Sequence, residues 1–419
     1  MKKYLFSVSF LLLATIFVVN SCKVKPEPSL FDPNYVSGPQ PVITDISPDS
    51  AFAGIGILTI TGKNFIADPS QNWVYFDKKQ GTITEATTTE LTVVAPPVVS
   101  DSVKIKIAVQ GSDKFSDPVV YKLMAAVESM YGFKPSEVPQ KLAADNTGNI
   151  YFTMFDNGNL ADSVYVLNYK TGIRKGFGPA LKQYDAMRVG PSNQLYALHG
   201  TRKTIYRYPE EGGEPEVIID RHTLKSKIYD FDFGPNQNLW GAGKADVIVE
   251  INLNDKSVTN FDFPGQVTAV KIYNGDIYLA TKRNDTHKIY RRHIVSADSL
   301  APEEEYFDLS QIFDMTTILE DRVAGMSFSQ DGYLYISCQD DPSAPNSPAV
   351  IAIAPGGASF EDMYPVLFSP ERKNNSLTWG MANGTNLFIS RTEIRDATGN
   401  ITSPAVILRV NTLKKGATQ

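Results

Sequence analysis

The hydrophobic pattern of the chain repeats one short unit, and its clearest copy lies at residues 326–338. Two apolar runs, Met326 with Phe328 and then Tyr333 to Ile336, are separated by a polar turn that contains Asp331-Gly332. Because glycine readily takes the positive φ that a tight turn needs, this unit predicts a β-hairpin. The second run is apolar at successive positions, which indicates a strand buried on both faces.

Copies of this hairpin recur along the larger, C-terminal part of the chain at intervals of roughly 40 to 60 residues. Each copy has an aromatic residue at the same point of its second strand, namely Tyr151, Tyr196, Trp240, Tyr278, Tyr335 and Phe388. Further strand-like runs follow each hairpin, as at Val164 to Leu167 and Glu216 to Ile219. In the fifth unit the last run is Pro365 to Phe368, and the hairpin of the sixth unit is Gly380 to Phe388. Six units of about four strands predict a six-bladed β-propeller, because a two-sheet sandwich does not explain six matching units.

The two ends of the repeat array complement each other. Val127 to Phe133 precedes the first unit and has the pattern of a fourth strand, whereas the last unit ends near Thr412 without one. We therefore expect the N-terminal run to complete the last blade and to remove an exposed sheet edge.

The N-terminus has the pattern of an export signal. Met1-Lys2-Lys3 precedes an apolar run from Tyr4 to Asn20, and Ser21-Cys22 follows. A basic start, an apolar run that is short for a membrane span and a small residue before the cut indicate a signal peptide over residues 1–21.

The end of this signal resembles the lipobox of bacterial lipoproteins, in the residues Val19-Asn20-Ser21-Cys22. Asn20 departs from the small residue usual at its position. The resemblance implies that Cys22 is lipidated and anchors the protein in the lipid bilayer of the outer membrane, with the cell-surface and periplasmic faces left open. The alternative is a plain secretory signal with an incidental cysteine. The chain has one other cysteine, Cys338, so a lipidated Cys22 leaves no pair for an internal disulfide.

Two further segments lie between the signal and the repeats. Residues 22–40 are rich in proline and poor in apolar side chains, which predicts a semi-extended tether. Residues 41–123 contain short strand-like runs separated by turn residues, which predicts a small β-sandwich.

The predicted sandwich resembles the IPT/TIG family of immunoglobulin-like domains. The resemblance rests on the spacing Pro48, Ala51 and Gly54, on Thr59-Ile-Thr-Gly-Lys-Asn-Phe65, on Val74-Tyr-Phe76 and on Leu91-Thr-Val-Val-Ala-Pro96. It implies an immunoglobulin-like fold and says little about function, since many such domains act as spacers.

Composition and motifs exclude several classes of function. The net charge of −6 argues against non-specific nucleic-acid binding, so we expect no nucleic-acid partner. The four histidines lack the HExxH spacing of zinc proteases, and no G-x-S-x-G nucleophile motif is present. Asp145 to Gly148 and Asp331-Gly332 lack the full set of ligands of a calcium loop and are interpreted as turns. We therefore assign no catalytic residue, metal or cofactor.

The propeller topology predicts where a ligand binds. Loops that precede each inner strand and loops that follow each second strand share one face, and every blade contributes to the mouth there. The candidate ligand-binding residues in these loops are Tyr184, Tyr229, Asp230, Arg322, Trp379 and Arg391. The aromatic side chains suit stacking on a sugar ring, and the charged ones suit hydroxyl or carboxylate groups. For any one of them the alternative is an ordinary solvated loop residue.

Residues 124–419 resemble the NHL and related propeller families in the G-N-x-Y type of hairpin and in no catalytic motif. A lipoprotein with an IPT/TIG domain ahead of such a propeller is similar to the accessory lipoproteins of bacterial glycan-uptake systems. This similarity implies a membrane-anchored, non-catalytic protein that binds a glycan or oligosaccharide, with an outer-membrane transporter as candidate partner. Two alternatives stay open: a propeller lyase, hydrolase or lactonase, and an envelope scaffold for protein interactions.

Overall fold

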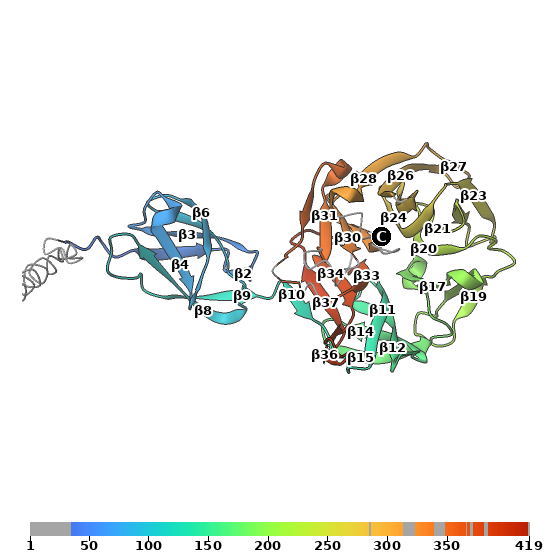
Figure 1. Ribbon diagram of the computed structural model, residues 1–419, viewed down its shortest axis with the longest axis horizontal. Coiled ribbons are helices and arrows are strands. Elements are labelled where there is room, and N and C mark those ends of the chain that lie inside the picture. The colour runs from blue at the N-terminus through green and yellow to red at the C-terminus, as the bar shows by residue number, and fades with distance from the viewer. Residues whose placement is uncertain are drawn as a thin grey trace, which may run out of the picture.

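The structure is a computed structural model, and it describes residues 35–284, 286–312, 323–338, 348–365, 367–368, 372–380 and 384–417. Within these ranges the regular elements are β-strands and short 3₁₀ turns, so the fold is all-β as predicted. Figure 1 shows a small N-terminal body followed by a ring of sheets. No helix in the described part of the chain is long and apolar enough to cross a membrane. The lipobox and Cys22 lie outside the described residues.

The N-terminal body is a sandwich of two sheets, with the strand orders β1-β3-β7-β6 and β2-β9-β8-β4-β5. Burial alternates along β4, so that Val74 and Phe76 face the core and Trp73 and Tyr75 lie partly outside it. This alternation is expected of strands that bury one face against a second sheet. The strands are β1 (Val42–Ser47), β2 (Ser50–Phe52), β3 (Ile57–Lys63), β4 (Asn72–Phe76), β5 (Lys79–Gln80), β6 (Thr82–Ala86), β7 (Glu90–Val94), β8 (Ser100–Val109) and β9 (Val119–Met124).

The ring is a propeller whose six sheets surround a central axis (Figure 1). Cavities lined by the inner strands lie at the two ends of this axis, which we call the central channel. Blade 1 contains β11 (Glu137–Ala144), β12 (Asn149–Asp156), β14 (Ser163–Asn168) and β15 (Ile173–Pro179). Blade 2 contains β16 (Ala186–Val189), β17 (Leu195–His199), β18 (Thr204–Arg207) and β19 (Glu216–Ile219). Blade 3 contains β20 (Ile228–Phe233), β21 (Leu239–Gly243), β22 (Val247–Ile251) and β23 (Val258–Asp262).

The other three blades repeat this order. Blade 4 contains β24 (Gln266–Tyr273), β25 (Asp276–Arg283), β26 (Thr286–Ser296) and β28 (Glu304–Asp308). Blade 5 contains β29 (Val323–Phe328), β30 (Leu334–Cys338), β31 (Val350–Ile353) and β32 (Phe360–Asp362). Blade 6 contains β33 (Asn374–Trp379), β34 (Asn386–Arg391), β37 (Val406–Asn411) and β10 (Val127–Ser129). Short strands β13 (Asn159–Leu160), β27 (Ser299–Leu300), β35 (Ile394–Arg395) and β36 (Ile401–Ser403) accompany blades 1, 4 and 6.

The ring closes as predicted, because the first strand of the propeller completes its last blade. In β10, Val127 pairs with Val410 of β37, and Ser129 pairs with Leu408. Two expectations for strand positions are wrong. The fourth strand of blade 5 is Phe360–Asp362 rather than residues 365–368, and the inner strand of blade 6 begins at Asn374 rather than at Gly380.

The repeated aromatic residue of the second strand joins neighbouring blades. Tyr196 packs edge-on against Phe233 of the next inner strand, with ring centroids 5.0 Å apart. Tyr278 packs on Phe328 at 4.6 Å, and Tyr335 packs edge-on against Trp379 at 5.2 Å. Phe233, Phe328 and Trp379 are each the last residue of an inner strand. The aromatic repeat in the sequence therefore marks the contact between blades.

Candidate functional site: the propeller mouth

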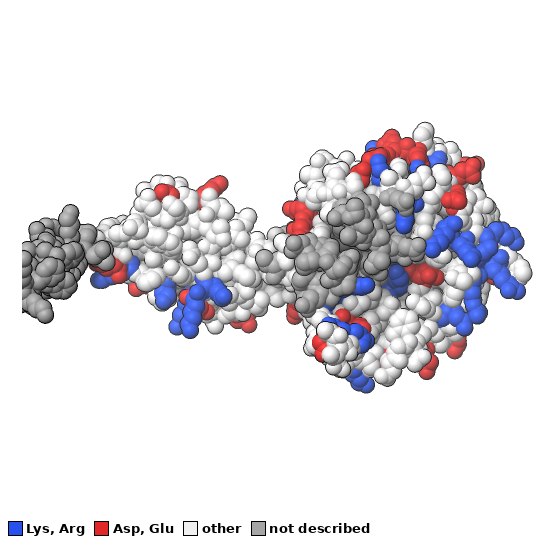
Figure 2. All heavy atoms as spheres, viewed as in Figure 1, with Lys and Arg blue, Asp and Glu red and all other residues white. Residues whose placement is uncertain are grey.

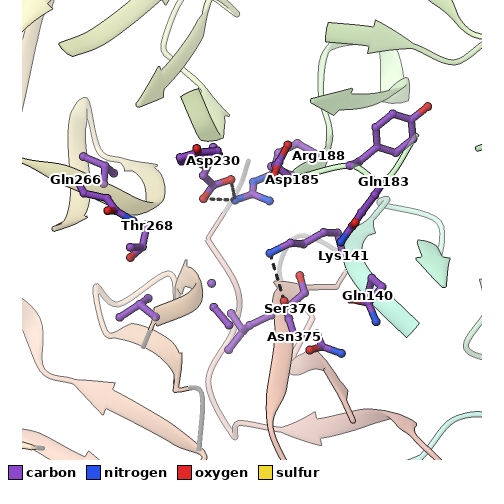
Figure 3. A pocket seen from close by; sticks show the side chains of 18 of the residues that line it. Gln140, Lys141, Gln183, Asp185, Arg188, Asp230, Gln266, Thr268, Asn375 and Ser376 are labelled. Atoms are coloured by element: carbon purple, nitrogen blue, oxygen red, sulfur yellow. Dashed lines mark hydrogen bonds and ion pairs between the residues drawn. The ribbon is translucent and has the colours of Figure 1, made fainter. Parts of the chain in front are cut away.

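A cavity of about 330 Å³ lies at one end of the central channel, where the inner strands begin (Figure 3). All six inner strands or the loops just before them contribute to its lining, which is mostly polar. The lining includes Gln140, Lys141, Gln183, Tyr184, Asp185, Arg188, Tyr229, Asp230, Lys244, Gln266, Thr268, Asn375 and Ser376. This cavity is the mouth that the arrangement of loops predicted.

The floor of the mouth is an ion pair that spans two blades. Arg188 of β16 places Nη2 2.7 Å from Oδ1 and 2.9 Å from Oδ2 of Asp230 in β20. The backbone N–H groups of Val270 and Phe231 also donate to the Asp230 carboxylate, at 2.8 and 2.9 Å. Burial raises the pKa of Asp230, whereas the Arg188 charge and these N–H groups act to lower it. The carboxylate is thus held in one orientation by three inner strands.

Polar contacts also join the first and last blades beside the mouth. The Ser376 hydroxyl accepts a hydrogen bond from the Leu142 N–H at 3.1 Å, and the Asn375 amide donates to Pro139 O at 2.9 Å. Lys141 extends toward blade 6, with its Nζ 3.5 Å from Asn375 O (Figure 3). Its charge is close enough to contribute to lowering the pKa of Asp230. Two cationic groups, Lys141 and Arg188, therefore border the cavity floor.

Three of the candidate residues from the sequence line the mouth. Asp230 lies in its floor, and Tyr229 is half-buried, with Lys244 Nζ 5.8 Å from its ring centroid. Tyr184 has only 1% of its surface exposed, and its hydroxyl lies 2.8 Å from that of Tyr208. Since Tyr208 donates onward to Pro179 O, Tyr184 faces the core between blades and offers little ring surface to a ligand. Tyr229 is the more accessible of the two aromatic residues.

Trp379 does not lie in a loop at the mouth, so that prediction is wrong. It is the last residue of β33, has 2% of its surface exposed, and packs against Tyr335 while its Nε1 donates to Gly384 O at 2.8 Å. It borders a second cavity of about 480 Å³ at the opposite end of the channel. The physical reason is the contact between blades, which requires an apolar ring at the end of the inner strand.

Arg391 is likewise not among the residues that line the mouth cavity. It ends β34 with 1% of its surface exposed, donates from Nη2 to Arg372 O at 2.7 Å, and has its guanidinium 5.6 Å from the Phe368 ring centroid. These contacts hold Arg391 against Phe368 and against the backbone at Arg372, which precedes β33. Arg322 lies outside the described residues.

The sequence interpretation missed Lys141 and Arg188. Arg188 is a single charged residue within an otherwise apolar inner strand, Ala186–Val189, whereas Lys141 shares its strand with Glu137 and directly follows Gln140. Lys271 has the same setting in β24, and its Nζ lies 2.8 Å from Asp232 Oδ2 deeper in the channel. Because side chains alternate along a strand, an isolated charge between apolar residues points to the channel, and this signal could have identified Arg188 and Lys271 but not Lys141.

The calcium-like loop at Asp145 is a turn, as interpreted from the sequence. Asp145 Oδ1 accepts hydrogen bonds from the N–H groups of Thr147, Gly148 and Asn149, at 2.8 to 2.9 Å. These N–H donors hold the pKa of Asp145 below its ordinary value although burial acts to raise it. Among the described residues, no three His, Cys, Asp or Glu side chains are grouped closely enough to hold a metal ion.

Comparison with known proteins bears on the N-terminal sandwich first. The IPT/TIG domain family matches residues 41–123. These residues are an IPT/TIG domain. The IPT/TIG match confirms the resemblance seen in the strand motifs, and it covers the described two-sheet sandwich. The sequence matches no curated protein.

Solved structures resemble the chain in fold. A structural genomics protein of unknown function from Bacteroides thetaiotaomicron VPI-5482 has a TM-score of 0.50 at 14% identity, covering 91% of this chain and 100% of that one. An auxiliary nutrient binding protein from the same organism has a TM-score of 0.47 at 12% identity, covering 90% and 98%. A luciferin-regenerating enzyme has a TM-score of 0.51 at 14% identity, covering 69% and 96%. At these identities the likeness to the first and third of these structures shows the fold, and function must be argued from the site.

Proposed function

We propose that this protein is a membrane-anchored, non-catalytic binding protein that holds a glycan in the propeller mouth, with the IPT/TIG domain as a spacer. The observation that carries the proposal is the described lining of the mouth, where amide, hydroxyl and charged side chains surround the accessible aromatic ring of Tyr229. A volume of about 330 Å³ lies within the range of small-ligand sites.

The chemistry of the lining suits a sugar. Side-chain amides such as Gln140, Gln183 and Asn375 can both donate to and accept from hydroxyl groups. The Tyr229 ring can bury the apolar C–H face of a pyranose, and a tyrosine loses little side-chain entropy when it does so. An apolar ligand would leave these polar groups without partners and is disfavoured.

The two carboxylates of the described lining favour binding over glycoside hydrolysis. Asp230 is held by Arg188, and Asp185 Oδ2 accepts a hydrogen bond from the Gly200 N–H at 2.7 Å. Hydrolysis ordinarily uses one carboxyl group as an acid and a second as a base or nucleophile, both directed at the substrate. Here both are engaged in holding loops and strands in place.

The N-terminal segment supplies the rest of the proposal. Lipidation of Cys22 would anchor the chain in the outer membrane, and the proline-rich residues 22–40 would keep the folded domains away from the bilayer. In that position a mouth that binds glycan would deliver it to an outer-membrane transporter, which is the proposed protein partner.

A glycan-array screen of the purified chain, followed by analysis of the bound glycans for cleavage, tests this function. We expect one or more glycans to be retained and recovered at their original length. Shortened or unsaturated products would instead establish the enzyme alternative. Capture of an envelope protein with no retention of any glycan would establish the scaffold alternative.

A further inference from the structure

A cluster of cationic side chains lies beside the mouth, on the same face of blades 2 and 3. It comprises Arg202, Lys203, Arg221, Lys225, Lys227 and Lys244, and we call it the cationic rim. These residues come from three loops, which join β17 to β18, β19 to β20 and β21 to β22. Figure 2 shows Lys and Arg side chains gathered over the part of the propeller that carries β17 and β19.

The charged groups of the cationic rim form no direct contact with a described acidic side chain. None of its six side chains forms an ion pair with a described residue, whereas Arg207 pairs with Glu216, and Arg283 with Glu303. The acidic side chains nearby bind the backbone instead. Asp220 accepts from the His222 and Thr223 N–H groups, and Asp246 accepts from the Gly265 N–H. A chain with a net charge of −6 therefore carries a local positive surface.

The cationic rim is continuous with the mouth. Lys244 lines the mouth cavity and lies over the Tyr229 ring. Lys203 donates from Nζ to Lys225 O, which links two of the three loops. Farther out, Arg202, Lys203 and Arg221 border an open groove of about 810 Å³. Cationic groups thus extend from Lys141 and Arg188 in the channel, past Lys244, to this groove.

We propose that the ligand of the mouth is an acidic polysaccharide, whose carboxylate or sulfate groups lie along the cationic rim while one sugar unit occupies the cavity. This inference rests on the proposed function and adds the charge class of the glycan. Like charges on neighbouring loops repel one another and give the surface a positive potential, and an anionic ligand bound along them would relieve that repulsion. A groove and a cavity that lie on one face, with cationic side chains at both, fit a single polymer chain better than a flat lipid surface.

Titration of the purified protein with polygalacturonate and with dextran sulfate, against neutral dextran, tests the inference. The variant R202Q/R221Q/K225Q removes three exposed charges of the cationic rim without touching the cavity lining. The matched control K78Q/K79Q/K104Q removes three exposed charges of the IPT/TIG domain. We expect the rim variant to bind an acidic polymer roughly tenfold more weakly, and the control to bind like the parent. Binding by the parent should also weaken more steeply with added salt than binding by the rim variant.

The outcomes separate this inference from the proposed function. If dextran binds in a manner that depends on Tyr229 and neither acidic polymer binds more tightly, the inference is overturned and the proposed function stands. If no polysaccharide binds at all, both are overturned. Loss of binding to phosphatidylglycerol vesicles in the rim variant, without polysaccharide binding by the parent, would identify a lipid-binding surface and overturn the inference.

Discussion

Arg188 and Asp230 form an ion pair across the boundary between blades 2 and 3, with Nη2 and Oδ1 2.7 Å apart at the floor of the mouth. Both side chains are largely buried, and Asp230 binds backbone N–H groups of blades 3 and 4 as well. The pair therefore couples three inner strands and gives the cavity a polar floor of fixed geometry.

Removal of one partner from this pair should destabilise the propeller. Arg188→Met leaves the Asp230 carboxylate buried without its counter-charge, and we expect a loss of about 3–5 kcal/mol in the free energy of unfolding. The double variant Arg188→Met/Asp230→Leu should recover part of that loss, because no buried charge remains. Chemical denaturation of the parent, both single variants and the double variant measures the coupling. If the losses in the free energy of unfolding of the two single variants simply add in the double variant, the two side chains are not coupled.

Glu137 and Arg174 should make the stability of blade 1 depend on pH. Arg174 Nη2 lies 2.9 Å from Glu137 Oε1, and the Lys134 N–H donates to Oε2 at 3.0 Å. Burial acts to raise the pKa of Glu137, but the hydrogen bond from Arg174, that from Lys134 and the Arg174 charge together hold it below its ordinary value.

A carboxyl group with a lowered pKa in the folded state contributes stability above its unfolded pKa. That stability is lost as the pH falls through the folded value. Glu137→Gln should therefore lose about 1.5–3 kcal/mol near neutral pH and differ less from the parent in acid. Denaturation curves at several pH values test this, and a difference that grows as the pH falls would contradict it.

Trp379 should matter for stability and not for ligand affinity. Trp379→Ala removes the ring that Tyr335 packs against and should cost about 3–5 kcal/mol of folding free energy. Trp379→Phe is the matched control, since phenylalanine occupies the same place at Phe233 and Phe328. We expect the Phe variant to recover most of the stability. Thermal unfolding measures the stability of each variant, and glycan titration of the folded protein measures its affinity. Weaker glycan binding by Trp379→Phe would place the tryptophan in the site.

The lipid anchor depends on one sulfur atom. Cys22→Ser removes the thiol that would be acylated, so the variant should leave the membrane fraction and appear in the soluble extract. Fractionation of cells after a high-salt wash, with metabolic labelling by a fatty acid, measures both effects. Retention of the unlabelled variant with membranes would show that another contact holds the protein there.

The parts of the fold that could be predicted from the sequence are those with a local signal. Asp331-Gly332 marks a hairpin because Gly332 takes a φ of +86°, and Tyr333 to Ile336 is apolar on both faces because neighbouring blades cover it. Ring closure could be predicted because the last unit lacks a fourth strand and an additional strand precedes the first unit. Blade 6 was placed too late because its inner strand, Asn374–Trp379, reads Asn-Asn-Ser-Leu-Thr-Trp and is mostly polar, so it lacks the apolar pattern of a buried strand.

The site was harder to predict because it depends on the closed ring. Lys141, Arg188 and Ser376 come from three different blades, and only the register of the inner strands brings them around one cavity. Trp379 carried a strong signal for sugar stacking as a residue type, but its position at the end of an inner strand places it between blades. Residue type alone therefore does not identify a ligand-binding residue in this fold, because aromatic side chains also form the contacts between blades.

The affinity of Tyr229→Ala for a glycan that the parent retains tests the central claim most directly. An aromatic ring stacked on a sugar is worth on the order of 1–2 kcal/mol, so we expect roughly tenfold weaker binding by calorimetry with little change in melting temperature. Tyr273→Ala is the control, because Tyr273 borders the cavity at the opposite end of the channel. It should bind the glycan as the parent does. Unchanged affinity in Tyr229→Ala, or an equal loss in Tyr273→Ala, would contradict glycan binding in the mouth.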